Sequence, residues 1–255
     1  MLIFSLINPK GGATKSTTAN LLATSLARKG AKTLLFETDK NVPQLKWALG
    51  CMVRWGKEKE KKAIEKIREG KKRRRVQVEH GENLTVLAHA DAEDVIPNLE
   101  WAAEQGYSYA VVDTEGTGDE ATTTAMSQSD LVILPIQPSR LDADCAEDAL
   151  AIIELGEKKF NRKLLAVAVV TACGVGVKSR IHRMVREELE EKGVNLLPSE
   201  IAHRAAYREM YEVGCTLQEL EKVGTSNLDK AIQNADEFTD SLLHFLEKSL
   251  EKDEA

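Results

Sequence analysis

The chain has 255 residues, of which 42% are hydrophobic and 30% are charged, and its formal net charge is −6. This is enough apolar sequence to bury one large core and too much for a disordered chain. No apolar run approaches the roughly 18 residues of a membrane-spanning helix, and the first residues lack the pattern of an export signal, so we expect a cytoplasmic protein.

Short apolar runs alternate with helical patterns along the chain, without a linker or an internal repeat. Strands are predicted at Leu2 to Ile7, Lys32 to Phe36, Leu84 to Leu87, Tyr109 to Asp113, Leu131 to Pro135, Leu164 to Val170 and Asn195 to Leu197. Helices are predicted at Lys15 to Lys29, Pro43 to Glu69, Ala92 to Gln105, Leu141 to Gly156, Lys178 to Lys192, Arg204 to Val213 and Leu228 to Leu250. Continuous apolar strands are typical of a sheet covered on both faces, so the sequence predicts a single α/β domain over residues 1–255 with a mainly parallel sheet flanked by helices.

A glycine-rich loop joins the first predicted strand to the first predicted helix. It reads Asn8-Pro9-Lys10-Gly11-Gly12-Ala13-Thr14-Lys15-Ser16-Thr17, and the order of strand, loop and helix is that of a phosphate-binding P-loop. Backbone N–H groups of such a loop surround the phosphates, the lysine reaches the β- and γ-phosphates, and the following hydroxyl binds Mg²⁺. The sequence therefore predicts nucleotide binding by Gly11, Gly12, Ala13, Thr14, Lys15, Ser16 and Thr17.

Thr14 stands where a strict P-loop has glycine. A β-branched residue is strained at positive φ, and its side chain can intrude on the path of the phosphates. This position therefore weakens the inference of nucleotide binding.

The second lysine in Lys10-Gly-Gly-x-x-Lys15-Ser16 resembles the deviant Walker A loop of the ParA/MinD group of P-loop ATPases. The resemblance continues in Glu37-Thr38-Asp39, where the family has Asp-x-Asp, and in the apolar strand that ends at Asp113. Glu37 keeps the acidity of the first carboxylate and lengthens its reach. The resemblance covers essentially the whole chain and implies the P-loop NTPase (deviant Walker A) fold.

The resemblance also implies ATP and Mg²⁺ as cofactors and gives roles to particular residues. Ser16 and Asp39 would lie at the metal, and Asp113 would hold a water on it. Asp39 would also orient the attacking water. Lys10 would reach across a dimer interface to the partner's phosphates, so that slow hydrolysis depends on dimerisation and on a stimulating partner protein.

The function implied is an ATP-dependent dimer that binds DNA without sequence preference in plasmid or DNA partition. The partner would be a centromere-binding or transfer-complex protein, and the dimer would be associated with the nucleoid or a plasmid. Leu34 to Pro43 and Ile201 to Met210 look like the related accessory ATPases of conjugative and T-DNA transfer, which is one alternative. A degenerate, non-hydrolysing nucleotide-binding scaffold is another, because of Thr14 and Glu37.

Positive charge is concentrated in one segment. Residues 54–79 hold twelve Lys or Arg and five Glu, a net +7, so the rest of the chain carries −13. The run Lys71 to Arg75 is a candidate for DNA phosphates, as are Lys178, Arg180, Arg183 and Arg186, which follow on one predicted helix. The alternative interpretation of both groups is a solvated helix face.

Other protein classes fit less well. The helix Leu228 to Leu250 has an apolar stripe that we expect to pack on the domain, and the acidic residues from Asp236 onward argue against a membrane-binding tail like that of MinD. Cys51, Cys145, Cys173 and Cys215 are widely scattered and the five histidines are isolated, so the sequence predicts free thiols and no metal cluster. We find no signature of the acceptor pocket that a small-molecule ligase or kinase would need.

Overall fold

The structure is a computed structural model that describes residues 1–8, 12, 14–50, 76–89, 91–115, 119–174, 176 and 178–253, with the backbone alone for 140–146. Within these ranges no helix combines the length and the apolar character needed to cross a bilayer.

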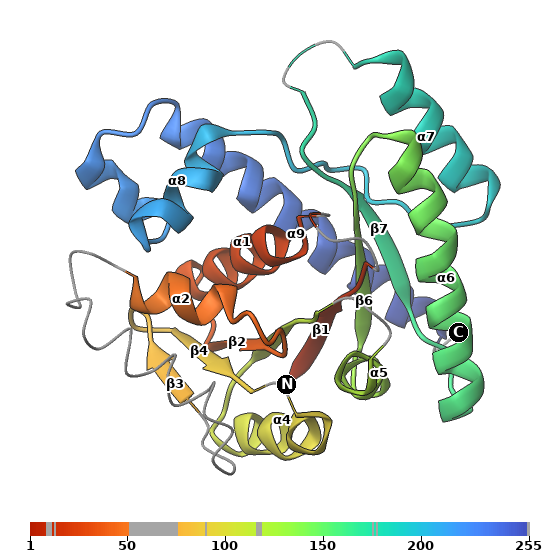
Figure 1. The fold of residues 1–255 in the computed structure, drawn as a ribbon, viewed down its shortest axis with the longest axis horizontal. Coiled ribbons are helices and arrows are strands. Elements are labelled where there is room, and N and C mark those ends of the chain that lie inside the picture. Colours follow the sequence, from red (N-terminus) through yellow and green to blue (C-terminus); the bar gives the residue numbers. More distant parts are fainter. Residues whose placement is uncertain are drawn as a thin grey trace.

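A seven-stranded sheet forms the centre of the molecule, in the order β3-β4-β2-β5-β1-β6-β7 (Figure 1). The strands are β1 (Leu2–Leu6), β2 (Thr33–Glu37), β3 (Val76–Glu79), β4 (Leu84–Ala88), β5 (Tyr109–Asp113), β6 (Leu131–Ile136) and β7 (Ala166–Val170). β3 is antiparallel to β4, and the other described pairs are parallel. The predicted fold class is confirmed.

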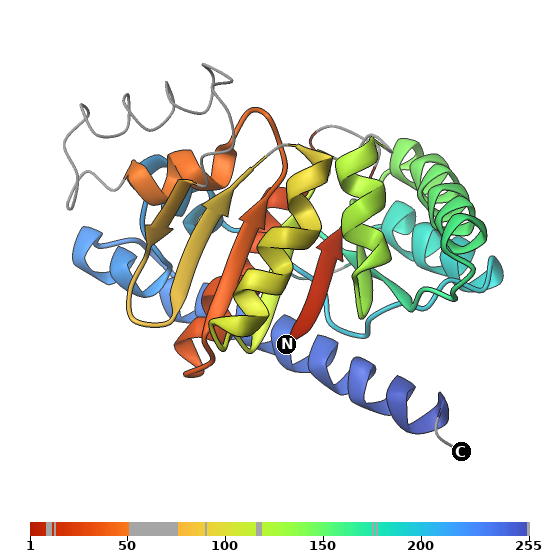
Figure 2. The same cartoon turned by 90° about the horizontal axis from the view of Figure 1, so that it is seen from below.

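Helices cover both faces of this sheet (Figures 1 and 2). They are α1 (Lys15–Arg28), α2 (Pro43–Leu49), α4 (Val95–Glu104), α5 (Glu120–Ser127), α6 (Arg140–Phe160), α7 (Arg180–Glu191), α8 (Ala205–Val213) and α9 (Leu228–Asp253), with short 3₁₀ turns at Ala92–Asp94 and Gln218–Val223. α1, α8 and α9 share one core with the sheet, whereas α4 and α5 pack on the opposite face. Alternate residues of β6 point to opposite faces of the sheet. Leu131 and Ile133 belong to the core shared with α1, while Val132 and Leu134 belong to a second core with α6.

Two predicted elements differ from the structure. The predicted helix Pro43 to Glu69 is wrong as one continuous helix, because α2 ends at Leu49 and Gly50 is not helical. Gly50 follows, and a Cβ on it would lie 2.7 Å from the carbonyl oxygen of Lys46. Residues 51–75, which include Lys71 to Arg75, lie outside the described part of the chain. The predicted strand Asn195 to Leu197 is reduced to one isolated bridge between Leu196 and Ala168.

Two elements were not predicted. β3 is short and has only two apolar residues, Val76 and Val78, that face the interior, so its periodicity is too brief to stand out. α5 is rich in threonine, which has low helix propensity. It forms because the side chain of Asp119 caps its first turn through the N–H of Thr122 (2.8 Å) and because one face is buried on the sheet.

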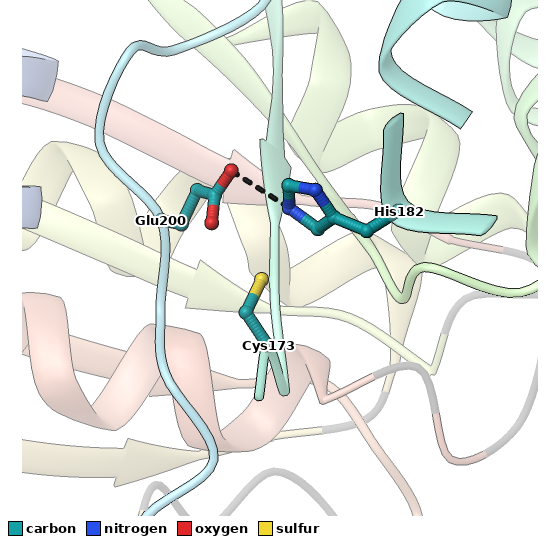
Figure 3. Close-up of side chains that lie close together, drawn as sticks. All are labelled: Cys173, His182 and Glu200. Atoms are coloured by element: carbon teal, nitrogen blue, oxygen red, sulfur yellow. Dashed lines mark ion pairs between the residues drawn. The ribbon is translucent and has the colours of Figure 1, made fainter. Parts of the chain in front are cut away.

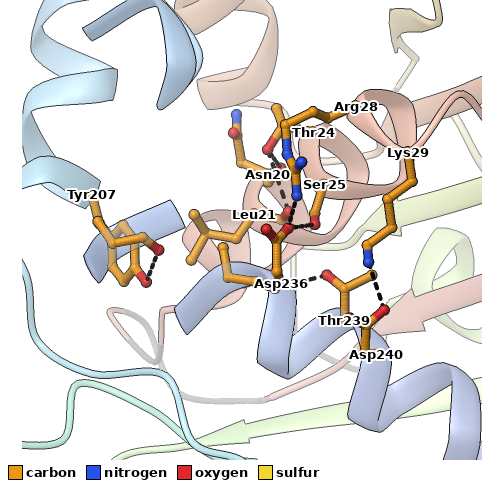
Figure 4. A network of polar contacts seen from close by, with 12 residues as sticks. Asn20, Leu21, Thr24, Ser25, Arg28, Lys29, Tyr207, Asp236, Thr239 and Asp240 are labelled. Carbon is orange, nitrogen blue, oxygen red and sulfur yellow. Dashed lines mark hydrogen bonds and ion pairs between the residues drawn. The ribbon is translucent and has the colours of Figure 1, made fainter. Parts of the chain in front are cut away.

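Polar contacts fix the long C-terminal helix to α1 (Figure 4). Oδ1 of Asp236 accepts a hydrogen bond from the Ser25 hydroxyl (2.6 Å) and forms an ion pair with Arg28. One turn later, Lys29 pairs with Asp240 at the surface (2.6 Å). Phe238 lies on the same helix, fully buried in the core shared with α1.

The two aspartates of α9 should differ in their contribution to stability. Asp236→Ala removes a hydrogen bond and a partly buried ion pair, and we expect a loss of about 1–2 kcal/mol of unfolding free energy. Asp240→Ala breaks one exposed pair and should cost less than about 0.5 kcal/mol. Urea unfolding of both variants measures the difference, and equal losses would contradict this account of how α9 is held.

Candidate nucleotide-binding site

The residues predicted to bind phosphate and magnesium lie at one edge of the sheet. β5 lies between β1 and β2, and Asp113 is in register with Leu6 of β1 and with Glu37 of β2. The loops that follow these three strands therefore start side by side, at the carboxyl end where open α/β sheets bind ligands. Three of the predicted residues lie outside the described part of the chain: Lys10, Gly11 and Ala13.

Lys15 is the first residue of α1, and its side chain folds back over the loop. Its Nζ donates to the carbonyl oxygen of Asn8 (2.9 Å), and only 9% of the residue is exposed. Burial lowers the pKa of Lys15, and the charges of Asp113 and Asp39 act in the opposite direction. The ammonium group thus lies among carboxylates where the phosphate loop meets the helix.

Thr14 adopts the strained conformation that its position predicts. Its φ is 61°, in the left-handed region, and its hydroxyl donates to the hydroxyl of Thr171 beyond the end of β7 (2.7 Å). This hydrogen bond holds the threonine side chain against the neighbouring loop and offsets part of the backbone strain. Ser16 and Thr17 follow in the first turn of α1, both partly buried.

Asp113 is fully buried at the end of β5. One carboxylate oxygen, Oδ2, accepts a hydrogen bond from Nε2 of Gln44 (2.8 Å). Burial raises the pKa of Asp113 to about 6, although Gln44, Ser16 and the charge of Lys15 act to lower it. The other oxygen, Oδ1, makes no hydrogen bond of normal geometry with the described residues.

Gln44 connects three elements of the site through one buried amide. Nε2 donates to Asp113 and to the carbonyl oxygen of Ser16 (2.8 Å each), so both of its hydrogens are used. Oε1 accepts from Nδ2 of Asn20 (3.1 Å). The hydroxyl of Tyr211, on α8, donates to the same carbonyl of Ser16 (2.7 Å). The sequence analysis missed Gln44, although a polar residue directly after Pro43, at the start of a helix on this edge of the sheet, is a signal that could have found it.

Glu37 caps a helix instead of facing the phosphate loop. It is fully buried, and its two carboxylate oxygens accept from the backbone N–H groups of Gln44 (2.7 Å) and Leu45 (3.0 Å) at the start of α2. Burial, and then the charge of Asp113, raise the pKa of Glu37 well above its ordinary value, whereas the two N–H groups lower it. The longer side chain is thus used to position α2 and, through it, Gln44.

The oxygen atoms at this edge fit a magnesium ion. Mg²⁺ prefers oxygen ligands and keeps several of its waters. Oδ1 of Asp113 is a buried oxygen without a hydrogen-bond partner in the described residues, and the side chain of Ser16 is close enough to lower the pKa of that carboxyl. Asp39, in the loop after β2, is held by the backbone N–H of Asn41 (2.7 Å to Oδ1) and is near enough to influence the pKa of both Asp113 and Lys15.

A cavity of about 430 Å³ opens beside the start of α1. It is lined by Thr14 and Thr17, by the segments after β7 and before α8, and by four residues of α8: Tyr207, Arg208, Tyr211 and Glu212. Its volume lies in the range of small-molecule sites. The cavity therefore has room for the rest of a ligand whose phosphates lie at Lys15.

The profile of the family described as "VirC1 protein" matches residues 1–252. The chain belongs to the VirC1 family. ParA of Rhizobium radiobacter is 27% identical to this VirC1-family chain over 250 residues, which cover 98% of the chain and 100% of ParA. The predicted resemblance to ParA-type ATPases is confirmed, because the VirC1-family chain is similar to ParA along nearly its whole length.

Solved structures share the fold. The ATP complex of an McdA variant from Cyanothece superposes with a TM-score of 0.68 at 16% identity and covers 95% of this chain and 96% of that one. The Mg-ADP complex of MinD from Pyrococcus horikoshii superposes with a TM-score of 0.65 at 18% identity and covers 96% and 98%. The VirC1-family chain therefore has the fold of the ParA/MinD P-loop ATPases.

Removing the amide of Gln44 should destabilise the site. Gln44→Leu leaves Oδ2 of Asp113 without its hydrogen bond in a buried position, and we expect a loss of about 2–3 kcal/mol of unfolding free energy. Gln105→Leu changes an exposed glutamine and should cost within about 0.5 kcal/mol. Urea unfolding compares the two, and equal stability of Gln44→Leu and the parent chain would refute the connecting role of the amide.

Asp113→Asn should change how stability depends on pH. Because the pKa of Asp113 is raised to about 6 in the folded protein, the folded state holds a proton between pH 4 and 6 that the unfolded state has released, so stability falls as pH rises through this window. Asparagine removes this loss, which is of the order of 3 kcal/mol above pH 6. We expect the variant to be more stable than the parent chain at pH 7 and nearly equal to it at pH 4, in thermal unfolding without nucleotide. A stability difference that does not change with pH would contradict the raised pKa.

Proposed function

We propose that this chain is a Mg²⁺-dependent ATP hydrolase whose ATP-bound homodimer binds DNA without sequence preference in plasmid or DNA partition. The observation that carries the proposal is the buried Asp113 carboxylate, with Oδ1 unpartnered among the described residues, next to Ser16 and Lys15 at the start of α1. A carboxylate, a hydroxyl and an ammonium group at the start of a helix are what phosphates and their metal ion require.

In the proposed site each residue has a separate task. Lys15 binds the β- and γ-phosphates after exchanging its contact with the Asn8 carbonyl for the phosphate oxygens. Ser16 and Asp113 would hold the magnesium ion, Asp113 through a water, and the ion would supply charge neutralisation at the phosphates. Gln44 keeps Asp113 oriented, and Asp39 orients the attacking water. Lys10 supplies positive charge across the dimer interface as the γ-phosphoryl group leaves.

The cavity supports ATP as the ligand. It starts at Thr14 and Thr17, directly beside the proposed phosphate site, and its lining combines apolar and aromatic residues such as Ile201 and Tyr207 with charged ones such as Arg208. An adenosine group attached to phosphates at Lys15 can enter it. Bound ATP and Mg-ADP in the two structural neighbours, McdA and MinD, agree with this choice.

Of the four candidate DNA contacts, Lys178 lies just before α7 and the other three lie on it, and two of the four remain candidates. Lys178 and Arg186 both form ion pairs with Glu200, and Arg186 also approaches Glu190. Arg180 and Arg183 are exposed on the same helix. We therefore propose Arg180 and Arg183, together with Lys71 to Arg75, as the cations that bind DNA phosphates.

Two other functions are compatible with the same site. The match to the VirC1 profile favours an accessory ATPase of conjugative or T-DNA transfer, which would use the same ATP-dependent dimer with a transfer-complex partner. A nucleotide-binding scaffold without hydrolysis is favoured by the strained Thr14 and by Glu37, whose two oxygens are used to cap α2.

Light scattering of the purified protein with ADP or with ATP and Mg²⁺ tests the proposal. We expect ATP alone to convert the monomer into a dimer that binds non-specific duplex DNA, and we expect Lys15→Ala to abolish both. Lys230→Ala, which removes an exposed lysine of α9, should change neither. Because Arg180 and Arg183 are proposed to bind phosphates and the dimer carries two copies of each, replacing both by Gln should lower the slope of log affinity against log salt by about 4 per dimer.

Each other outcome has a definite meaning. ATP binding and dimerisation without phosphate release would favour the scaffold over the hydrolase. Absence of ATP binding would overturn the proposal, since the phosphate loop would then not accept nucleotide with threonine at position 14.

A further inference from the structure

Three side chains with metal-binding atoms meet outside the phosphate site (Figure 3). They are Cys173, just after β7, His182, in the first turn of α7, and Glu200, in the segment before α8. The thiol sulfur, an imidazole nitrogen and a carboxylate oxygen all lie within 4.8 Å of one another. The sequence predicts no such cluster, because the three residues are far apart in the chain and none has a second ligand at close spacing.

The imidazole nitrogens of this cluster lack hydrogen-bond partners within the described residues. His182 is only 4% exposed, and its Nδ1 makes no hydrogen bond. Its Nε2 lies 2.8 Å from Oε1 of Glu200 without the alignment of a hydrogen bond. Cys173 is buried as well, and its thiol makes a long contact with the carbonyl oxygen of Thr171 (3.7 Å) and interacts with the side chain of Glu200. Buried polar groups normally have partners, so this geometry requires an explanation.

We propose that Cys173, His182 and Glu200 form a zinc site. Sulfur, imidazole nitrogen and carboxylate oxygen together are the ligands of Zn²⁺, whereas Mg²⁺ and Ca²⁺ prefer oxygen alone. Three protein ligands and one water complete the four-coordinate arrangement that zinc adopts in proteins. The ion would bind both Nε2 of His182, which lies next to Glu200, and the sulfur of Cys173.

The surroundings of Glu200 suit this role. Lys178 binds Oε2, and Nη1 of Arg186 lies 3.1 Å from Oε1, so both cations orient the carboxylate from outside the cluster, as residues around metal ligands commonly do. Burial, and then the charge of Glu200, raise the pKa of the Cys173 thiol to about 12, so the thiol is neutral before metal binds. A thiolate and a carboxylate then balance the two charges of the ion, and the thiol proton is released to solvent on binding.

Zinc at this position would connect the two segments that line the nucleotide cavity. The N–H of Cys173 donates to the carbonyl oxygen of Ile201 (3.1 Å), and the N–H of His203 donates to that of Cys173 (2.7 Å). Ala172, Ile201 and His203 line the cavity itself. The metal would therefore hold the wall of the cavity opposite α1 in one arrangement.

Titration of the chelator-treated full chain with Co²⁺ and Zn²⁺ tests the proposal. We expect one equivalent of Co²⁺ to bind with thiolate-to-cobalt charge-transfer absorption, and Zn²⁺ to displace it. Loss of a ligand should weaken binding by at least about 100-fold in Cys173→Ser, His182→Gln and Glu200→Gln, since even residues that only support metal ligands account for 10–100-fold. Cys215→Ser, which removes another buried cysteine, should bind as the parent chain does.

Thermal unfolding provides a second measurement that also controls for folding. One equivalent of Zn²⁺ should raise the unfolding temperature of the parent chain and of Cys215→Ser, and should leave that of Cys173→Ser unchanged. Absence of stoichiometric binding would overturn the proposal. So would charge-transfer absorption that persists in Cys173→Ser, because another thiol would then hold the metal.

Discussion

The candidate site depends on one buried amide. Asp113 ends a central strand of a parallel sheet, where it is fully buried, and a buried carboxylate needs a donor. Gln44 supplies that donor and also binds the first turn of α1 and, through Asn20, a later turn of it. Glu37 fixes the start of α2 and so places Gln44. These hydrogen bonds thus hold the loop after β2, the end of β5 and the start of α1 in one arrangement. Because the groups are buried, hydrogen bonds to water cannot replace them.

Burial at this edge of the sheet disfavours the charged forms of the ionisable side chains, as is common at functional sites. Burial raises the pKa of Glu37 and Asp113 and lowers that of Lys15, so each group is less easily charged than in water. A bound phosphate would favour the charged lysine, and a bound cation would favour the charged carboxylate. The charged forms of these side chains are therefore stabilised only when ligands of the opposite sign bind, which is the behaviour expected of a nucleotide switch.

Motif and context predicted part of this site. Lys15, Ser16 and Asp113 follow from the strand, loop and helix order and from an apolar strand that ends in an acid, since a parallel sheet places such ends together. Gln44 and Tyr211 carry no motif, because their role depends on side-chain directions in a packed interior. The sequence analysis compared Glu37 with the first carboxylate of the family's Asp-x-Asp, whereas in the structure it caps α2. Acidity alone does not reveal that both of its oxygens accept hydrogen bonds from backbone N–H groups at the start of that helix.

Local order in the sequence determined the α/β class, six of the seven described strands and the start of α1 after the glycine-rich segment, because period, apolar runs and glycine positions act over a few residues. The tertiary structure alone decided β3, the early end of α2 at Gly50, and the meeting of Cys173, His182 and Glu200. β3 is stabilised mainly by pairing with β4, which no local pattern encodes. The three metal-binding side chains come from separate segments that only the packing of α7 against the end of β7 brings within reach.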